Sequence, residues 1–210
     1  MTDIHHHIPE PVLEAYRAGT LPHAFAVVVA AHVSLCDTCR ARHEAADLLG
    51  GVFLADAPQA ALRPNARAQI FEALTAPPPP PPVRGSDIFP APVMVELQGQ
   101  PPQWRLLGGG IRQQILSADH TGSLRLLYIP SGKAVPKHGH RGLELTLVLQ
   151  GSFSDCEGHF SRGDVETAQD DIDHQPVADE GASCICLAAT DAPLRFHALI
   201  PRLLQPLFRI

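Results

Sequence analysis

Six consecutive prolines, Pro77 to Pro82, constrain the fold of this 210-residue chain more than any other feature. Proline has no backbone N–H and fixes φ, so neither a helix nor a central strand can run through such a segment. An extended, semi-rigid polyproline helix is the conformation that remains. We therefore expect a domain at residues 1–76, a linker at 77–90 and a second domain at 91–210. A stiff spacer also argues against a signal that passes through packed contacts.

Charge and composition restrict the possible functions. The net charge is −6 and the pI is about 6.0, whereas binding to a nucleic-acid backbone needs clustered Lys and Arg. The five cysteines are an odd number, and no basic-plus-apolar leader precedes them, so we expect the reducing cytoplasm. The apolar run from Phe25 to Ala31 is too short to span a bilayer, so we expect neither nucleic acid nor membrane as a partner.

The residues before the prolines have helical spacing and helical start and stop signals. We expect helices from Pro11 to Gly19, from Thr20 or Pro22 past His32, from Asp37 to Leu49 with Gly50-Gly51 as the stop, and from Pro64 to Ala76. The last of these carries Ile70, Phe71 and Leu74. These three side chains fit the core of a small domain and the contact surface for a partner protein equally well.

His32, Cys36 and Cys39 form a compact set of potential metal ligands in this helical half. Positions four apart share a helix face, and Cys39 follows three residues later. Structural zinc is four-coordinate and takes thiolate and imidazole ligands, so one more ligand must come from elsewhere. The run His5-His6-His7 is the obvious donor, and the residues alone leave all three candidates open. Four protein ligands would close the zinc shell and leave no position for catalytic water.

After the prolines, short apolar segments alternate with Gly, Pro and Asp. This spacing is typical of strands without intervening helices, and it favours an antiparallel sandwich or barrel. The expected strands lie at Trp104–Leu107, Ile111–Leu116, Leu124–Ile129, Leu143–Leu149 and Ser183–Ala189.

A second set of potential ligands lies between Gly132 and Gly151: His138, His140 and Glu144. Histidines two apart on an extended chain face the same side, and a Glu entering the next strand can complete the cluster. The segment Asp173-His174-Gln175-Pro176 offers a further imidazole.

With its two glycines, two histidines and glutamate, the first of these segments resembles the first motif of the cupin family at every position. The resemblance implies a cupin barrel, a double-stranded β-helix, with His138, His140, Glu144 and His174 as ligands of a divalent metal. In the second motif, Gln169, Asp171 and Ala178 stand where many cupins have Pro, Gly and Asn. Zinc is the metal we expect first; iron, manganese and nickel suit the same ligands.

The pattern His-x-x-x-Cys-x-x-Cys in a short helical domain resembles the zinc-binding anti-sigma factors. Together with a cupin half, the whole chain resembles the ChrR anti-sigma factors, including the N-terminal histidine run and the closing apolar tail from Leu203 to Ile210. The resemblance implies a multidomain α + β protein in which a small all-α zinc-binding domain precedes an all-β cupin barrel. It also implies His7 as the fourth zinc ligand.

The same resemblance implies a function. The N-terminal helices would bind and inhibit an extracytoplasmic-function sigma factor in the cytoplasm. The cupin half would be needed for release under oxidative stress, with singlet oxygen as the cue, and no residue would be catalytic. Two alternatives stay open: a cupin metalloenzyme, such as a dioxygenase or isomerase, with an accessory zinc domain, and a sensor of metal homeostasis.

The three cysteines of the second half have separate interpretations. Cys184 and Cys186 share strand parity, so they are either redox-sensitive thiols in the barrel or small apolar core residues. Cys156 stands between Asp155 and Glu157, and this acidic setting predicts an inert thiol.

Overall fold

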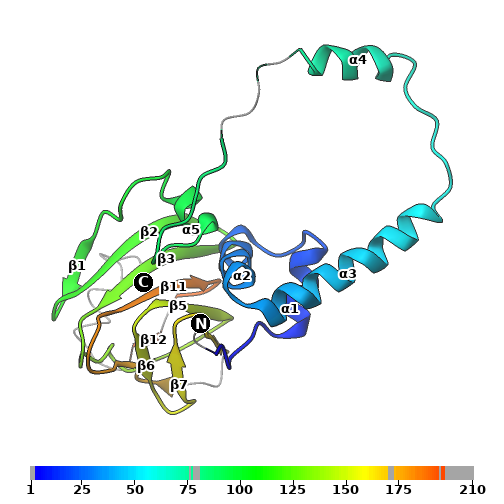
Figure 1. Ribbon diagram of the computed structural model, residues 1–210. Helices are drawn as coiled ribbons and strands as arrows, with labels where there is room; N and C mark the ends of the chain where they lie inside the picture. The colour runs from blue at the N-terminus through cyan, green and yellow to red at the C-terminus, as the bar shows by residue number, and fades with distance from the viewer. Residues whose placement is uncertain (1–2, 76, 78–80, 170–172, 194, 197–210) are drawn as a thin grey trace.

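The computed structural model describes residues 3–75, 77, 81–169, 173–193 and 195–196. Helices come first and antiparallel strands follow, in the predicted order (Figure 1). The predicted apolar tail, Leu203 to Ile210, and part of the proline run, residues 78–80, lie outside the described residues.

Among the described residues, four of the five helices agree with the sequence prediction except at their ends, and the fifth, at Ala91–Glu96, was not predicted. The helices are α1 (Glu10–Arg17), α2 (His23–Leu35), α3 (Asp37–Ala55), α4 (Ala66–Ala73) and α5 (Ala91–Glu96). The predicted stop at Gly50-Gly51 is wrong, because α3 continues through both glycines to Ala55. A glycine weakens a helix by about 1 kcal/mol but does not end it. The helix ends only as the chain approaches Pro58, which disfavours helical backbone at the residue before it.

The segment from Ser86 to Leu97 belongs to the folded core, although the predicted linker extended to residue 90. Phe89, Val93 and Leu97 are buried in the same hydrophobic cluster as α2. The chain returns to the core before the first strand, through the short helix α5.

The strands form three antiparallel sheets, and we call β1 to β12 together the strand domain. The largest sheet has the order β1-β2-β3-β11-β5-β8, and the smaller sheets have the orders β10-β6-β7 and β12-β4-β9. The bounds are β1 (Arg105–Gly108), β2 (Ile111–Asp119), β3 (Gly122–Ile129), β4 (His138–Gly139), β5 (Glu144–Gln150), β6 (Ser152–Ser154), β7 (His159–Ser161), β8 (Val165–Ala168), β9 (Asp173–His174), β10 (Val177–Ala178), β11 (Cys184–Thr190) and β12 (Arg195–Phe196).

Strand β5 shows how the large sheet separates two interiors. Its residues are nearly all buried, and successive side chains point to opposite faces. Leu145, Leu147 and Leu149 join the cluster that contains the helices, whereas Val148 joins the second cluster inside the strand domain. Glu144 and Thr146 share the parity of Val148, so polar side chains line the inner face.

Helix α2 packs on the outer face of this sheet, against β3, β5 and β11. Its apolar residues surround the whole helix, which is typical of a helix covered on all sides. Figure 1 shows α2 between the sheet and the remaining N-terminal helices. Phe25, 2% exposed, marks the contact, because a Cβ on Gly122 would lie 3.5 Å from its ring. The helical half and the strand domain therefore share one continuous hydrophobic cluster.

The N-terminal segment is tied to the turn before β8. The backbone amides of His5 and His6 donate to Oδ1 of Asp164 at 2.7 and 2.8 Å, and the amide of Val165 donates to the His6 carbonyl. Burial alone would raise the pKa of the Asp164 carboxyl, but these amides and Ser161 hold it below its usual value. This direct docking differs from the expected pair of domains connected only by a stiff spacer.

The far end of α3 and the helix α4 lie away from the strand domain (Figure 1). Ile70, Phe71 and Leu74 are 61%, 57% and 73% exposed, so they are not core residues of this chain. The end of α3 is equally exposed and apolar, a feature that the sequence analysis missed because it ended the helix at Leu49. Its exposed side chains are Leu48, Leu49, Val52, Phe53 and Leu54.

Among the described residues, no single helix is long and apolar enough to cross a membrane. Only α2 and α3 taken together meet that test of length and composition, as a pair bent by 109°.

Candidate metal sites

The helical half contains a cluster of four potential ligand atoms, from His7, His32, Cys36 and Cys39, all within 4.8 Å of one another. Nδ1 of His7 lies 3.3 Å from Sγ of Cys36 and 3.7 Å from Sγ of Cys39. His32 comes from the last turn of α2, and the two cysteines come from the start of α3. Two imidazoles and two sulfurs at this spacing suit tetrahedral zinc.

The environment of His32 fits a metal ligand. Its Nδ1 lies 2.9 Å from the carbonyl oxygen of Gly163, which fixes the hydrogen on Nδ1 and leaves a lone pair on Nε2. That Nε2 is buried and finds no hydrogen-bond partner among the described residues. Burial lowers the pKa of His32 to about 4, so the ring is neutral at pH 7, the form that binds metals.

Cys36 and Cys39 occupy the N-terminus of α3. Sγ of Cys36, the N-cap residue, accepts a hydrogen bond from the Cys39 amide at 3.4 Å. Burial raises the pKa of Cys39 to about 11, so without a cation this thiol keeps its hydrogen. A bound metal would reverse that preference, because the thiolate is the ligand form.

The structure separates the three N-terminal histidines that the sequence left open. His7 lies in the cluster, whereas the His6 ring packs against Phe160 with a centroid distance of 4.4 Å. His5 is exposed, and its backbone amide bonds Asp164. This placement favours His7, and ligation by His7 stays a prediction.

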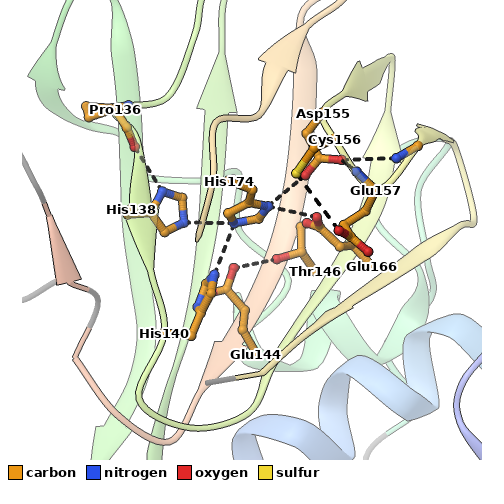
Figure 2. Close-up of polar contacts among 11 residues, drawn as sticks. Pro136, His138, His140, Glu144, Thr146, Asp155, Cys156, Glu157, Glu166 and His174 are labelled. Carbon is orange, nitrogen blue, oxygen red and sulfur yellow. Dashed lines mark hydrogen bonds and ion pairs between the residues drawn. The ribbon is translucent and has the colours of Figure 1, made fainter. Parts of the chain in front are cut away.

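The second cluster lies inside the strand domain, where three imidazoles converge (Figure 2). Nε2 of His174 lies 3.0 Å from Nε2 of His140 and 3.1 Å from Nε2 of His138. Two nitrogens bound at about 2.1 Å to one ion lie about 3.0 Å apart at a right angle and about 3.4 Å apart at the tetrahedral angle. The observed separations therefore fit a shared cation.

Pairing of the short strands β4 and β9 creates this convergence, because His138 is directly opposite His174 in the register. His140 follows β4 immediately. Nδ1 of His138 lies 2.9 Å from the carbonyl oxygen of Pro136, which places the ring hydrogen on Nδ1 and directs Nε2 toward the cluster. Burial lowers the pKa of both His138 and His140 and keeps their rings neutral.

Glu144, the fourth predicted ligand, lies next to this cluster. Its Oε2 is 3.4 Å from Nδ1 of His140, and its Oε1 accepts a hydrogen bond from Oγ1 of Thr146 at 2.9 Å. The carboxylate thus contacts the side of the His140 ring opposite to the converging nitrogens. The structure brings three of the four predicted side chains together and holds Glu144 at the edge.

Two buried carboxyl groups that the sequence analysis missed lie behind His174. Oδ2 of Asp155 is 2.7 Å from Nδ1 of His174, and Oε1 of Glu166 is 3.0 Å from the same atom. Burial raises the pKa of Glu166 to about 7, and the two carboxyl groups raise the pKa of His174 to about 9 against the effect of burial. No signal in the sequence indicates them, because Asp155 and Glu166 meet His174 only when the strands come together in the fold.

The remaining cysteines differ in exposure. Cys184 and Cys186 are buried with their sulfurs 3.4 Å apart, and Cys156 is exposed next to Glu157. The hydrogen bond with Cys184, burial and nearby carboxylates raise the pKa of Cys186 far above its usual value. Such a thiol is a poor nucleophile, which favours the apolar interpretation of the pair.

Comparison with known proteins identifies close relatives. A family model described as the ChrR cupin-like domain matches residues 94–192. The anti-sigma-E factor ChrR of Cereibacter sphaeroides is 49% identical over 211 residues, with 99% of each chain covered. A crystal structure of Rhodobacter sphaeroides SigE in complex with the anti-sigma ChrR matches with a TM-score of 0.80 and 46% identity, covering 90% of this chain and 100% of that chain.

These likenesses confirm the predicted fold class, a helical N-terminal region followed by a cupin domain. The relation extends over the proline segment and both candidate metal sites, because it covers nearly the whole chain.

Proposed function

The chain belongs to the ChrR family of anti-sigma factors, and we propose that it binds and inhibits an extracytoplasmic-function sigma factor in the cytoplasm. Its full-length relative is an anti-sigma-E factor, which supports a regulatory role for this chain over the metalloenzyme alternative. The anti-sigma ChrR forms a complex with SigE of Rhodobacter sphaeroides, which supports a sigma factor as the partner of this chain.

The observation that carries the proposal is the exposed apolar surface of α3 and α4. We define it as Leu48, Leu49, Val52, Phe53 and Leu54 on α3 with Ile70, Phe71 and Leu74 at α4. Groups of large apolar side chains that stay exposed in a folded chain mark interaction sites. Helices that present apolar residues in this way typically lie in a groove of the partner.

Zinc would shape this surface without catalysing a reaction. We assign His7, His32, Cys36 and Cys39 as its ligands, supported by their convergence and by the unpartnered, buried Nε2 of His32. Cys36 and Cys39 belong to the first turn of α3, so the ion would fix the start of the helix whose far end carries the apolar surface. Zinc-dependent inhibition follows from this arrangement.

The cupin domain would hold a second divalent ion and receive the signal. We assign His138, His140, Glu144 and His174 as its ligands, with zinc first and iron, manganese or nickel as alternatives. The convergence of three buried imidazoles supports the site. By family likeness the signal is oxidative stress, with singlet oxygen as the cue that releases the sigma factor.

The test is purification of the full chain from its native cells, followed by metal analysis and by binding measurements with the recovered sigma factor. A leucine-to-aspartate change gives a matched pair: Leu54 on α3 is 77% exposed, and Leu106 on β1 is 61% exposed. We expect Leu54→Asp to weaken sigma binding at least tenfold, since it removes a leucine that the complex would bury and adds a charge. Leu106→Asp should bind as the wild type does. Equal binding by both variants, or recovery without a sigma factor, would contradict the proposal.

A further inference from the structure

We propose that Asp155 and Glu166 are positioning residues of the cupin metal site, which hold the His174 ring so that its Nε2 faces the Nε2 atoms of His138 and His140. The inference rests on the proposed role of His174 as a metal ligand. Neither carboxyl group belongs to the ligand set implied by the cupin motifs, and both lie on the side of the ring away from the converging nitrogens (Figure 2).

Hydrogen bonds within its own turn hold the Asp155 side chain in place. Its Oδ1 accepts hydrogen bonds from the amides of Glu157 at 2.9 Å and Gly158 at 3.2 Å, and its own amide donates to the Gly158 carbonyl. The turn between β6 and β7 therefore orients the carboxylate and leaves Oδ2 directed at Nδ1 of His174. The Asp155 side chain is fully buried, so water does not compete for this contact.

Glu166 approaches the same nitrogen from a different strand. It lies on β8 opposite Thr146 of β5, and its side chain is 4% exposed. One oxygen of Asp155, one of Glu166 and a nitrogen of His174 lie within 4.8 Å of one another. Carboxyl groups from a turn and from a strand thus converge on one ring atom.

The chemistry of imidazole gives these contacts their consequence. A neutral ring carries one hydrogen and one lone pair, and an acceptor at Nδ1 places the hydrogen there. The lone pair of Nε2 then faces the other two histidines, where a metal would bind. A carboxylate behind the ring also increases the basicity of the ligating nitrogen more than a neutral carbonyl does.

An ion pair that only stabilises the fold is the competing interpretation. In that case the carboxyl groups would neutralise a charged His174, and their removal would lower stability whether or not metal is present. A positioning role predicts instead a loss of metal affinity at this site alone. The N-terminal cluster provides the internal reference, since its two cysteines give cobalt(II) a sulfur charge-transfer band that a nitrogen–oxygen site lacks.

The experiment measures cobalt(II) and zinc affinity of each site in the full chain by competition with a chelator. The variants are Asp155→Asn, Glu166→Gln and the double change, with Glu157→Gln as the matched control, because Glu157 is an exposed neighbouring carboxylate. We expect each single change to weaken the cupin site about 10- to 100-fold, the usual effect of removing such a partner. The control and the N-terminal site should keep their affinities, so that the loss is confined to the cupin site.

Two further measurements separate the possible failures. If His174→Ala leaves the metal affinity of the cupin site unchanged, the assignment of His174 as a ligand is wrong. If His174→Ala abolishes metal binding while the carboxyl variants bind like the wild type, the assignment stands and the positioning role is overturned. Nitrogen-15 NMR of the zinc-loaded wild type needs no variant: a hydrogen on Nδ1 of His174 is expected, and coordination through Nδ1 would overturn the inference.

Discussion

Replacing Phe25 with alanine tests whether the helical half and the strand domain fold as one unit. Phe25 is 2% exposed on α2 and belongs to the cluster that also contains Leu145 and Leu187 of the large sheet. The phenylalanine with the opposite environment is Phe53, 76% exposed at the end of α3. Phe53→Ala therefore makes the same chemical change without touching the core.

The magnitude follows from burial. An aromatic side chain buries about 150–250 Å², which at about 25 cal/mol per Å² is about 4–6 kcal/mol, and measured Phe→Ala changes in cores cost about 3–5 kcal/mol. For a chain of this size, 1 kcal/mol lowers the thermal midpoint by about 2–4 °C, so Phe25→Ala should lower it by about 6–20 °C. The Phe53 variant should stay within about 0.5 kcal/mol of the wild type.

Two optical probes observe the two halves of the protein. The single tryptophan, Trp104, adjoins β1 and contacts Tyr128 of β3, so its fluorescence reports on the strand domain. Circular dichroism at 222 nm reports mainly on the helices. With zinc present, urea unfolding of the Phe25 variant should shift both signals together. If the dichroism transition moves and the fluorescence transition does not, the shared core is not a thermodynamic unit and the reasoning fails.

Three further predictions concern the metal sites. The Cys36→Ala variant should lose zinc binding and sigma binding together, because the start of α3 loses its fixed position. Zinc analysis and a binding titration measure these two losses. Sigma binding retained by a metal-free variant would contradict the prediction. In the zinc-free chain, burial lowers the pKa of His32 from 6.5 to about 4, so only the unfolded state gains a proton between these pH values. His32 should contribute a loss of about 3 kcal/mol of stability as the pH falls through that window, at about 1.36 kcal/mol per pH unit, and this contribution is measured as the difference between urea titrations of the wild type and of His32→Gln. The Glu144→Ala variant should still inhibit transcription by the sigma factor but should fail to release the sigma factor under singlet oxygen. If this variant does not inhibit in a transcription assay, the assignment of inhibition to the helical half and of signal reception to the cupin half would be reversed.

The sequence predicted those features that depend on local pattern. Strand β5 was recognisable because its leucines alternate with inward-facing residues, and such alternation is fixed by the strand itself. The ligand sets were recognisable because a helix and an extended chain place residues at fixed spacings on one face. The helix stop at Gly50-Gly51 failed for a related reason: the penalty for glycine is small and local, whereas α3 continues to Ala55.

Features that depend on distant contacts were not predictable. Asp164 appears in the sequence as an ordinary turn residue, and its bonds to the amides of His5 and His6 join segments more than 150 residues apart. Asp155 and Glu166 likewise meet His174 only because β6, β8 and β9 come together in the fold. No spacing rule relates residues on different sheets, so the partners behind a metal ligand require the structure.

The stiff proline spacer suggested that the two halves communicate without packed contacts, but the structure provides such contacts at the start of β8. The Gly163 carbonyl lies 2.9 Å from Nδ1 of His32, and Oε1 of Glu166 lies 3.0 Å from Nδ1 of His174. Only two residues, Asp164 and Val165, thus separate a partner of the helical cluster from a partner of the cupin cluster. Asp164 between them holds the backbone that leads to His7. The structure therefore provides packed contacts between the neighbourhoods of the two clusters that do not include the prolines.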